Sequence, residues 1–298
     1  MFERISSLFD FRLALLLNFV AILAALLSGP FFLETGLVQV VAVLYIFLGF
    51  MAVAARHIDD RFLRRFLEQA TLLALIIFAC AHLFVYLWQL YSNSVSSDGL
   101  LLSLVNLHLA GLIVILLGAE FVIKIYKRDS SRGSLWVLSI LAALSVAATP
   151  FFMTQEASLS VGANGLLPYF LLLAFAGIFT LAFTYLLRLR ALVPVLKKFA
   201  EHFLGAFVFM GVAAIIVVFK SVIMSNLDVP YYMVAYSAYF MLYTSMAFLY
   251  LTGTERFSNV SQLYKEVENY TKPSRQELKI NSNNKKVGRR KNKKAIKI

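Results

Sequence analysis

The chain has 298 residues, of which 60% are hydrophobic and only 15% are charged, and its formal net charge is +12. A soluble domain is about half apolar and about a quarter charged, so this composition excludes an ordinary soluble globular protein. It predicts an all-α integral membrane protein. The single cysteine, Cys80, excludes a disulfide framework within the chain.

Eight apolar runs recur along the chain, each near the roughly 20 residues that an α-helix needs to cross a bilayer. They cover Leu13–Leu33, Leu37–Ala55, Ala70–Tyr91, Leu100–Ile125, Leu135–Met153, Leu166–Leu187, Phe203–Met224 and Tyr231–Leu251. No A-x-A-like cleavage site with a polar mature start follows the first run, so we expect it to be retained as a signal anchor. The sequence therefore predicts eight transmembrane helices.

The Lys and Arg residues give an orientation to this arrangement. They precede the first run and follow the second, fourth, sixth and eighth runs, whereas the opposite loops contain none. Lys220, inside the seventh run, is the exception. By the positive-inside rule, we expect a multi-pass protein whose N- and C-termini are both cytoplasmic.

The second half of the chain resembles the first. "AILAALLSGPFF", which ends at Phe32, matches "LAALSVAATPFF", which ends at Phe152, and "FLRRFLEQ" (Phe62–Gln69) matches "VLKKFAEH" (Val195–His202). We expect a tandem 4+4 repeat, with halves at residues 1–128 and 129–254, related by a pseudo-two-fold axis along the membrane normal. The alternative is that common preferences for Pro and Phe at helix ends produce the matches without duplication.

Two histidines fall within neighbouring apolar runs, where ionisable side chains are rare and are candidates for function. With a rise of 1.5 Å per residue, His82 and His108 both lie roughly 13 Å from the outer ends of their helices. A haem with two imidazole ligands, a shared metal ion or a proton relay needs such a level pair. The alternative is that each imidazole hydrogen-bonds a polar group across a helix interface, with Asn106 and Tyr86 nearby in sequence.

Six further residues are candidates for a substrate pathway. They are Glu120, Lys220 and a stripe of tyrosines at helical spacing, Tyr232, Tyr236, Tyr239 and Tyr243. Simpler explanations exist for each: an i,i+4 ion pair of Glu120 with Lys124, outward snorkelling of Lys220 or its contact with Asp228, and interhelical hydrogen bonds from the tyrosines.

Residues 255–298 form a basic segment that we expect to be a largely disordered cytoplasmic tail. Its end, Lys285–Ile298, contains cations and no acid. The candidates for binding anionic lipid head groups are Lys285, Lys286, Arg289, Arg290, Lys291, Lys293 and Lys294. The same charge attracts nucleic acid or ribosomes, but this stretch lacks the aromatic side chains that stack on bases, so the bilayer is the favoured partner.

No nucleophile–base arrangement, phosphate-binding glycine loop or surface cluster of carboxylates is recognisable, so we expect a protein that is not an enzyme and has no cofactor. The repeat favours a transporter or permease of a small or lipidic solute, with its site between two four-helix halves. One alternative is a membrane sensor or scaffold whose basic tail recruits a cytoplasmic protein or anionic lipid. The other is a haem-bearing electron-transfer subunit that uses His82 and His108.

Overall fold

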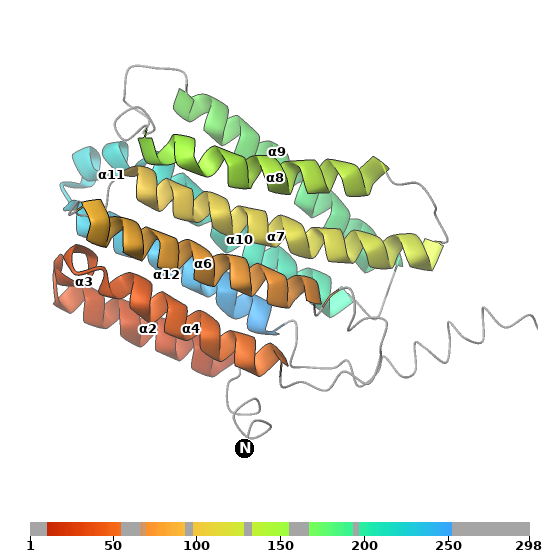
Figure 1. Cartoon of the computed structure of the whole chain (residues 1–298), viewed down its shortest axis with the longest axis horizontal. Coiled ribbons are helices and arrows are strands. Elements are labelled where there is room, and N and C mark those ends of the chain that lie inside the picture. Colours follow the sequence, from red (N-terminus) through yellow and green to blue (C-terminus); the bar gives the residue numbers. More distant parts are fainter. Residues whose placement is uncertain are drawn as a thin grey trace, which may run out of the picture. The chain divides into compact units, whose positions relative to one another are not determined.

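The computed structural model describes residues 11–54, 67, 69–92, 98–127, 133–154, 167–192 and 197–251, and these contain helices and turns but no strand (Figure 1). The helices are α2 (Phe11–Leu27), α3 (Phe31–Glu34), α4 (Leu37–Ala54), α6 (Gln69–Ser92), α7 (Asp98–Lys127), α8 (Gly133–Thr154), α9 (Leu167–Leu192), α10 (Lys197–Val218), α11 (Lys220–Leu227) and α12 (Tyr231–Leu251).

Every predicted apolar run overlaps one long helix. Five helices are long and apolar enough to cross a membrane, and they contribute Gln69–Tyr91, Gly99–Lys124, Gly133–Phe152, Leu171–Arg188 and Phe199–Val218. α2 and α4 contribute the shorter apolar segments Arg12–Leu27 and Leu37–Met51. The described part of the chain is thus all-helical and has the helices of a multi-pass membrane protein, whereas the count of eight spans stays a prediction.

Two predicted spans are interrupted. The first run is divided because Gly29 takes the left-handed φ of 64° and α2 ends before it. The seventh run is divided at Phe219, which lies between α10 and α11, and Asp228 ends α11 with a φ of 51°. Predicting each of these runs as one continuous helix was therefore wrong, since apolarity alone does not report a change in backbone direction.

α7 lies at the centre of the helical unit, in contact with α6, α8, α9, α10 and α12 (Figure 1). Within its apolar window 83% of the residues are buried, against 22% in α8 and 17% in α9. Because α7 is surrounded by protein, its polar side chains must find partners on neighbouring helices or in its own backbone.

The chain divides into two units, Met1–Glu255 and Arg256–Ile298. Both predicted halves lie within the first unit. The second unit corresponds closely to the predicted tail and lies outside the described residues, as do all the lysines and arginines proposed to bind lipid.

Candidate functional site: a buried histidine pair

His82 of α6 and His108 of α7 lie side by side, as the shared depth predicts. Their ring centroids are 5.0 Å apart and the ring planes are nearly perpendicular, at 87°. The residues are 0% and 1% exposed. The pair is therefore an edge-to-face contact enclosed by protein.

His108 is held by its own helix and by an aromatic ring from α6. Its Nδ1 lies 2.9 Å from the carbonyl oxygen of Leu104, and its ring stacks on Phe78 with the centroids 4.4 Å apart and the planes at 7°. A carbonyl oxygen can only accept, so Nδ1 must carry the hydrogen. In the neutral imidazole this leaves a lone pair on Nε2.

His82 is held by a chain of polar groups from two other helices. Its Nδ1 lies 2.6 Å from Oε1 of Gln39 on α4, and Nε2 of Gln39 donates to the hydroxyl oxygen of Tyr239 on α12 at 2.5 Å. Gln39 is fully buried and Tyr239 is 2% exposed. One chain of hydrogen bonds thus joins α4, α6 and α12.

Gln39 is not among the candidate residues predicted from the sequence. His82 does form a hydrogen bond with an amide across a helix interface, as the alternative to a haem or metal site predicts. That amide belongs to Gln39 and not to Asn106. Asn106 instead donates to the carbonyl oxygen of Ser145 on α8. The available signal was that Gln39 is an isolated amide within the apolar stretch "LVQVVAVL".

The tyrosine stripe of α12 faces protein. Tyr236 donates to the carbonyl oxygen of Gly29 and Tyr243 to that of Val38, each at 2.8 Å. The rings of Tyr239 and Tyr243 lie 6.4 and 6.2 Å from the ring of His82, and the ring of Tyr232 lies 6.0 Å from that of Tyr236. Interhelical hydrogen bonding thus accounts for the hydroxyls of Tyr236 and Tyr243, and a role for the stripe in a pathway stays a prediction.

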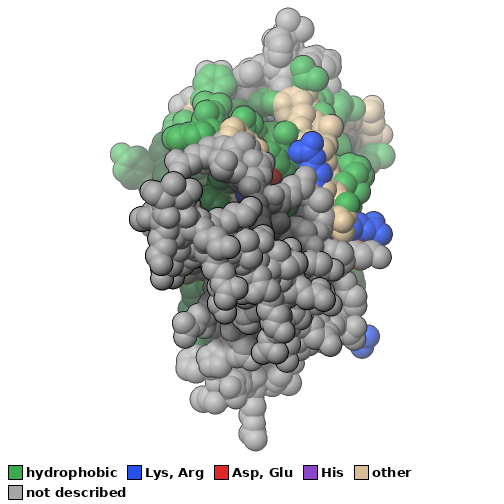
Figure 2. Space-filling view, turned by 90° about the vertical axis from the view of Figure 1, so that its right-hand side faces the viewer, with side chains coloured by type: hydrophobic (Ala, Val, Ile, Leu, Met, Phe, Trp, Pro, Cys, Tyr) green, Lys and Arg blue, Asp and Glu red, His purple; other side chains and the backbone are tan. Residues whose placement is uncertain are grey.

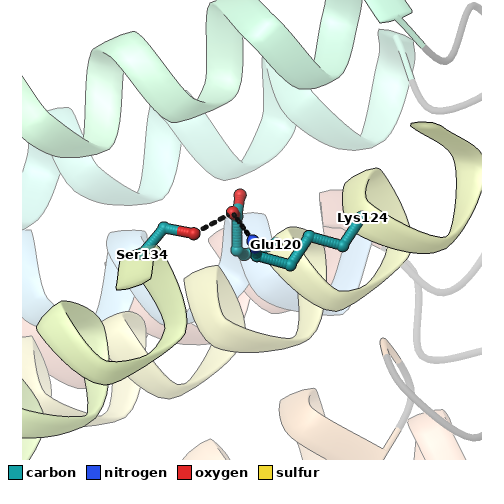
Figure 3. A network of polar contacts seen from close by, with 3 residues as sticks. All are labelled: Glu120, Lys124 and Ser134. Carbon is teal, nitrogen blue, oxygen red and sulfur yellow. Dashed lines mark hydrogen bonds and ion pairs between the residues drawn. The ribbon is translucent and has the colours of Figure 1, made fainter. Parts of the chain in front are cut away.

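A second polar cluster joins α7 and α8 near the end of α7. The predicted pair is present, with Nζ of Lys124 3.8 Å from Oε1 of Glu120, and the hydroxyl of Ser134 donates to the same carboxylate oxygen (Figure 3). Both charged residues are 7% exposed. Because the carboxylate is already engaged twice, the contacts give it a role in fixing α8 against α7.

Lys220 lies at the start of α11 and is buried, so it does not snorkel outward. Its Nζ lies 5.9 Å from the centroid of the Tyr231 ring, which is a cation–π distance. The lysine and the histidine pair share no contact among those found for the described residues. Lys220 thus contributes to packing between α11 and the start of α12.

The histidine pair does not have the arrangement of a haem site. Two axial imidazoles lie on opposite faces of a porphyrin, whereas these rings touch each other directly at 5.0 Å. Among the described residues, no group of three or more His, Cys, Asp or Glu side chains is placed to hold a metal ion. What the pair offers chemically is two buried ring nitrogens: no hydrogen-bond partner is found for Nε2 of either residue.

No protein-family model matches the sequence, and no curated protein and no solved structure matches it significantly.

Proposed function

We propose that the protein is a non-enzymatic, eight-span transporter of a small solute, with its site between two co-oriented four-helix halves. The observation that carries the proposal is the buried cluster around His82. It draws Gln39, His82 and His108 from the predicted first half and Tyr239 and Tyr243 from the predicted second half. Polar groups at depth and between repeats are typical of a transport site.

The distribution of basic residues supports the proposed orientation. α7 and α9 carry Lys124, Arg188 and Arg190 towards their C-terminal ends, and these helices are the fourth and sixth predicted spans, so their C-terminal ends follow an even number of spans. Figure 2 looks onto one end of the molecule, where described Lys and Arg side chains are visible among hydrophobic ones. We therefore propose that this end of the helical unit faces the cytoplasm, the side on which the positive-inside rule also predicts both chain termini.

The burial of α2 and α8 supports the repeat. At the separation of 120 residues that aligns Pro30 with Pro150, most aligned residues of the two helices share the same degree of burial. Asn18 and Leu138 are both buried, as are Ala25 and Ser145. The exposed positions correspond in the pairs Leu16 and Trp136, Leu17 and Val137, and Val20 and Ile140.

The contacts between helices repeat as well. α4 packs on α6 as α9 packs on α10, and α6 packs on α7 as α10 packs on α12. The first helix of each proposed half packs on the last helix of the other: α2 contacts α12, and α8 contacts α7. This exchange is what a pseudo-two-fold axis between the halves requires.

The proposal is tested with purified protein in liposomes. Stopped-flow light scattering measures the uptake of a panel of small neutral solutes: water, urea, glycerol and ammonia. We expect faster uptake of at least one of them than in protein-free liposomes. The variant Gln39→Leu should abolish the increase, because it breaks the chain between His82 and Tyr239.

Thr180→Val is the matched control, because this exposed hydroxyl bonds only the carbonyl oxygen of Ala176 in its own helix. It should transport like the unaltered protein. Uptake equal to that of protein-free liposomes for the whole panel would contradict a transporter of small neutral solutes.

A further inference from the structure

The two Nε2 atoms of the histidine pair are the basis of a more specific inference. Both are fully enclosed, and no hydrogen-bond partner is found for either. A buried polar atom without a partner destabilises the folded protein, so native proteins rarely keep one without a bound water, ion or ligand. Because these two atoms belong to rings whose centroids lie 5.0 Å apart, one small guest is the simplest partner for both.

The hydrogen bonds of the pair restrict what this guest is. Nε2 of His108 is an acceptor, because Nδ1 donates to the carbonyl oxygen of Leu104. His82 is different, since the chain Tyr239–Gln39–His82 can run in either direction. With the amide of Gln39 turned over, its NH₂ group donates to Nδ1 of His82, and Nε2 of His82 then carries the hydrogen.

A guest that fits both directions must donate to His108 and either donate to or accept from His82. A metal ion satisfies only the direction in which both Nε2 atoms carry lone pairs. The groups in contact with the pair, Phe78, Gln39, Tyr239 and Tyr243, are also uncharged, so nothing among them offsets the desolvation of an ion. The site therefore favours a neutral guest.

We propose that His82 and His108 together hold one small neutral molecule that both donates and accepts hydrogen bonds, of the size of water or ammonia. This inference rests on the proposed function in one respect: it takes the guest as a member of the transported class of solute. The guest site itself does not require transport.

The site is tested by NMR on the full chain labelled with ¹⁵N-histidine. The sequence has only 4 histidines, so the signals of His82 and His108 are assigned by substituting each in turn. We expect the His108 signals to show a hydrogen on Nδ1, a hydrogen-bonded acceptor at Nε2, and a cross-peak from a slowly exchanging guest. Water is the guest in plain buffer, and added ammonia should shift both Nε2 signals.

Three results would overturn the guest site. The first is a ¹⁵N–¹⁵N coupling between the two rings, which means that they bond each other directly. The second is a His108 Nε2 signal of a lone pair without any hydrogen bond. The third is a change in both Nε2 signals when a strong metal chelator is added, which means that a metal ion occupies the site.

Transport is tested separately by dissipating an ammonium gradient across proteoliposomes that contain a pH-sensitive dye. His108→Phe keeps a ring that can stack on Phe78 but lacks the acceptor, and we expect ammonia flux to fall to that of protein-free liposomes. Ser103→Ala is the control, because its hydroxyl bonds the carbonyl oxygen of Thr149, remote from the pair in the hydrogen-bond network. His108→Gln restores an acceptor and should restore part of the flux.

The two experiments fail in different ways. If NMR shows a bound guest but ammonia flux does not exceed that of protein-free liposomes, the guest is not a transported solute. The guest site itself is then retained. A flux that His108→Phe does not lower, with the melting temperature unchanged, would contradict a role for the pair in transport. A ring-to-ring bond seen by NMR would remove the guest, whatever the flux.

Discussion

Gln39 is the residue on which the buried cluster around His82 depends most. It is the only group found to bond both His82 and Tyr239 among the described residues, and it is fully buried. In a low-dielectric interior each of these bonds is stronger than in water, but a partner that loses its bond cannot recover one from solvent. A single amide thus links α4, α6 and α12 by hydrogen bonds in the interior.

We expect Gln39→Leu to destabilise the protein by about 1–3 kcal/mol, because it leaves Nδ1 of His82 and the Tyr239 hydroxyl buried without partners. Reversible unfolding in mixed detergent micelles measures this change. The double variant Gln39→Leu with Tyr239→Phe should lose less stability than the two single variants added together. It also removes the Tyr239 hydroxyl, which Gln39→Leu alone leaves buried without a partner. Additive costs would contradict the bond between Gln39 and Tyr239.

At this scale the sequence predicted the histidines but not their partner. His82 and His108 stand out because imidazoles are rare within apolar runs, and the rise per residue of a helix places them at one depth. Gln39 carries no charge, and its orientation depends on how α4 packs beside α6, which is a tertiary property. Nothing in one sequence distinguishes it from Asn106, whose amide bonds α8 instead.

At the scale of helices, the close approach of α6 and α7 depends on glycine. A Cβ built on Gly111 would lie 2.3 Å from Cε1 of Phe78, the ring that stacks on His108. Gly177 of α9 is the opposite case, with no atom within 4 Å of such a Cβ. The two glycines therefore make a matched pair.

We expect Gly111→Ala to cost about 1–3 kcal/mol through overpacking and to displace Phe78 from the His108 ring. Gly177→Ala should stabilise the protein by about 0.5–1 kcal/mol, because alanine favours the helix and meets no neighbour. Thermal unfolding of both variants measures the difference. Equal effects of the two substitutions would contradict the packing of Phe78 on α7.

The two Pro-Phe-Phe stretches show what a motif leaves undecided about a helix. Pro30 follows Gly29, whose φ of 64° ends α2, and Phe31 begins the short α3. Pro150 follows Thr149 and lies inside α8. Because only glycine adopts that left-handed conformation without a steric cost, the residue before the proline accounts for the difference. Both stretches nevertheless keep the same edge-to-face contact between their phenylalanines, at 6.1 and 6.0 Å.

For the whole molecule, hydropathy predicts helices better than it predicts spans. α12 lies outside the set of five long apolar helices, yet most of its described residues are buried, among them Tyr236, Tyr239 and Tyr243. A tyrosine whose hydroxyl donates to a backbone carbonyl is satisfied inside the protein, so a buried helix can carry tyrosines although they lower its hydropathy. The charge pattern is therefore the independent argument that α12 crosses the membrane.

The charge pattern predicts the side of the membrane on which each loop lies. Reporter fusions after residues 130 and 298 should be cytoplasmic, and a fusion after residue 160 should be external, because the basic residues flank the same side of every predicted pair of spans and the positive-inside rule assigns that side to the cytoplasm. Paired reporters that are active only on opposite sides of the membrane measure each position. If α12 lay along the membrane instead of crossing it, residue 298 would be external while residues 130 and 160 kept their sides. That result would also remove the pseudo-two-fold axis, since α12 and α7 could then no longer be equivalent.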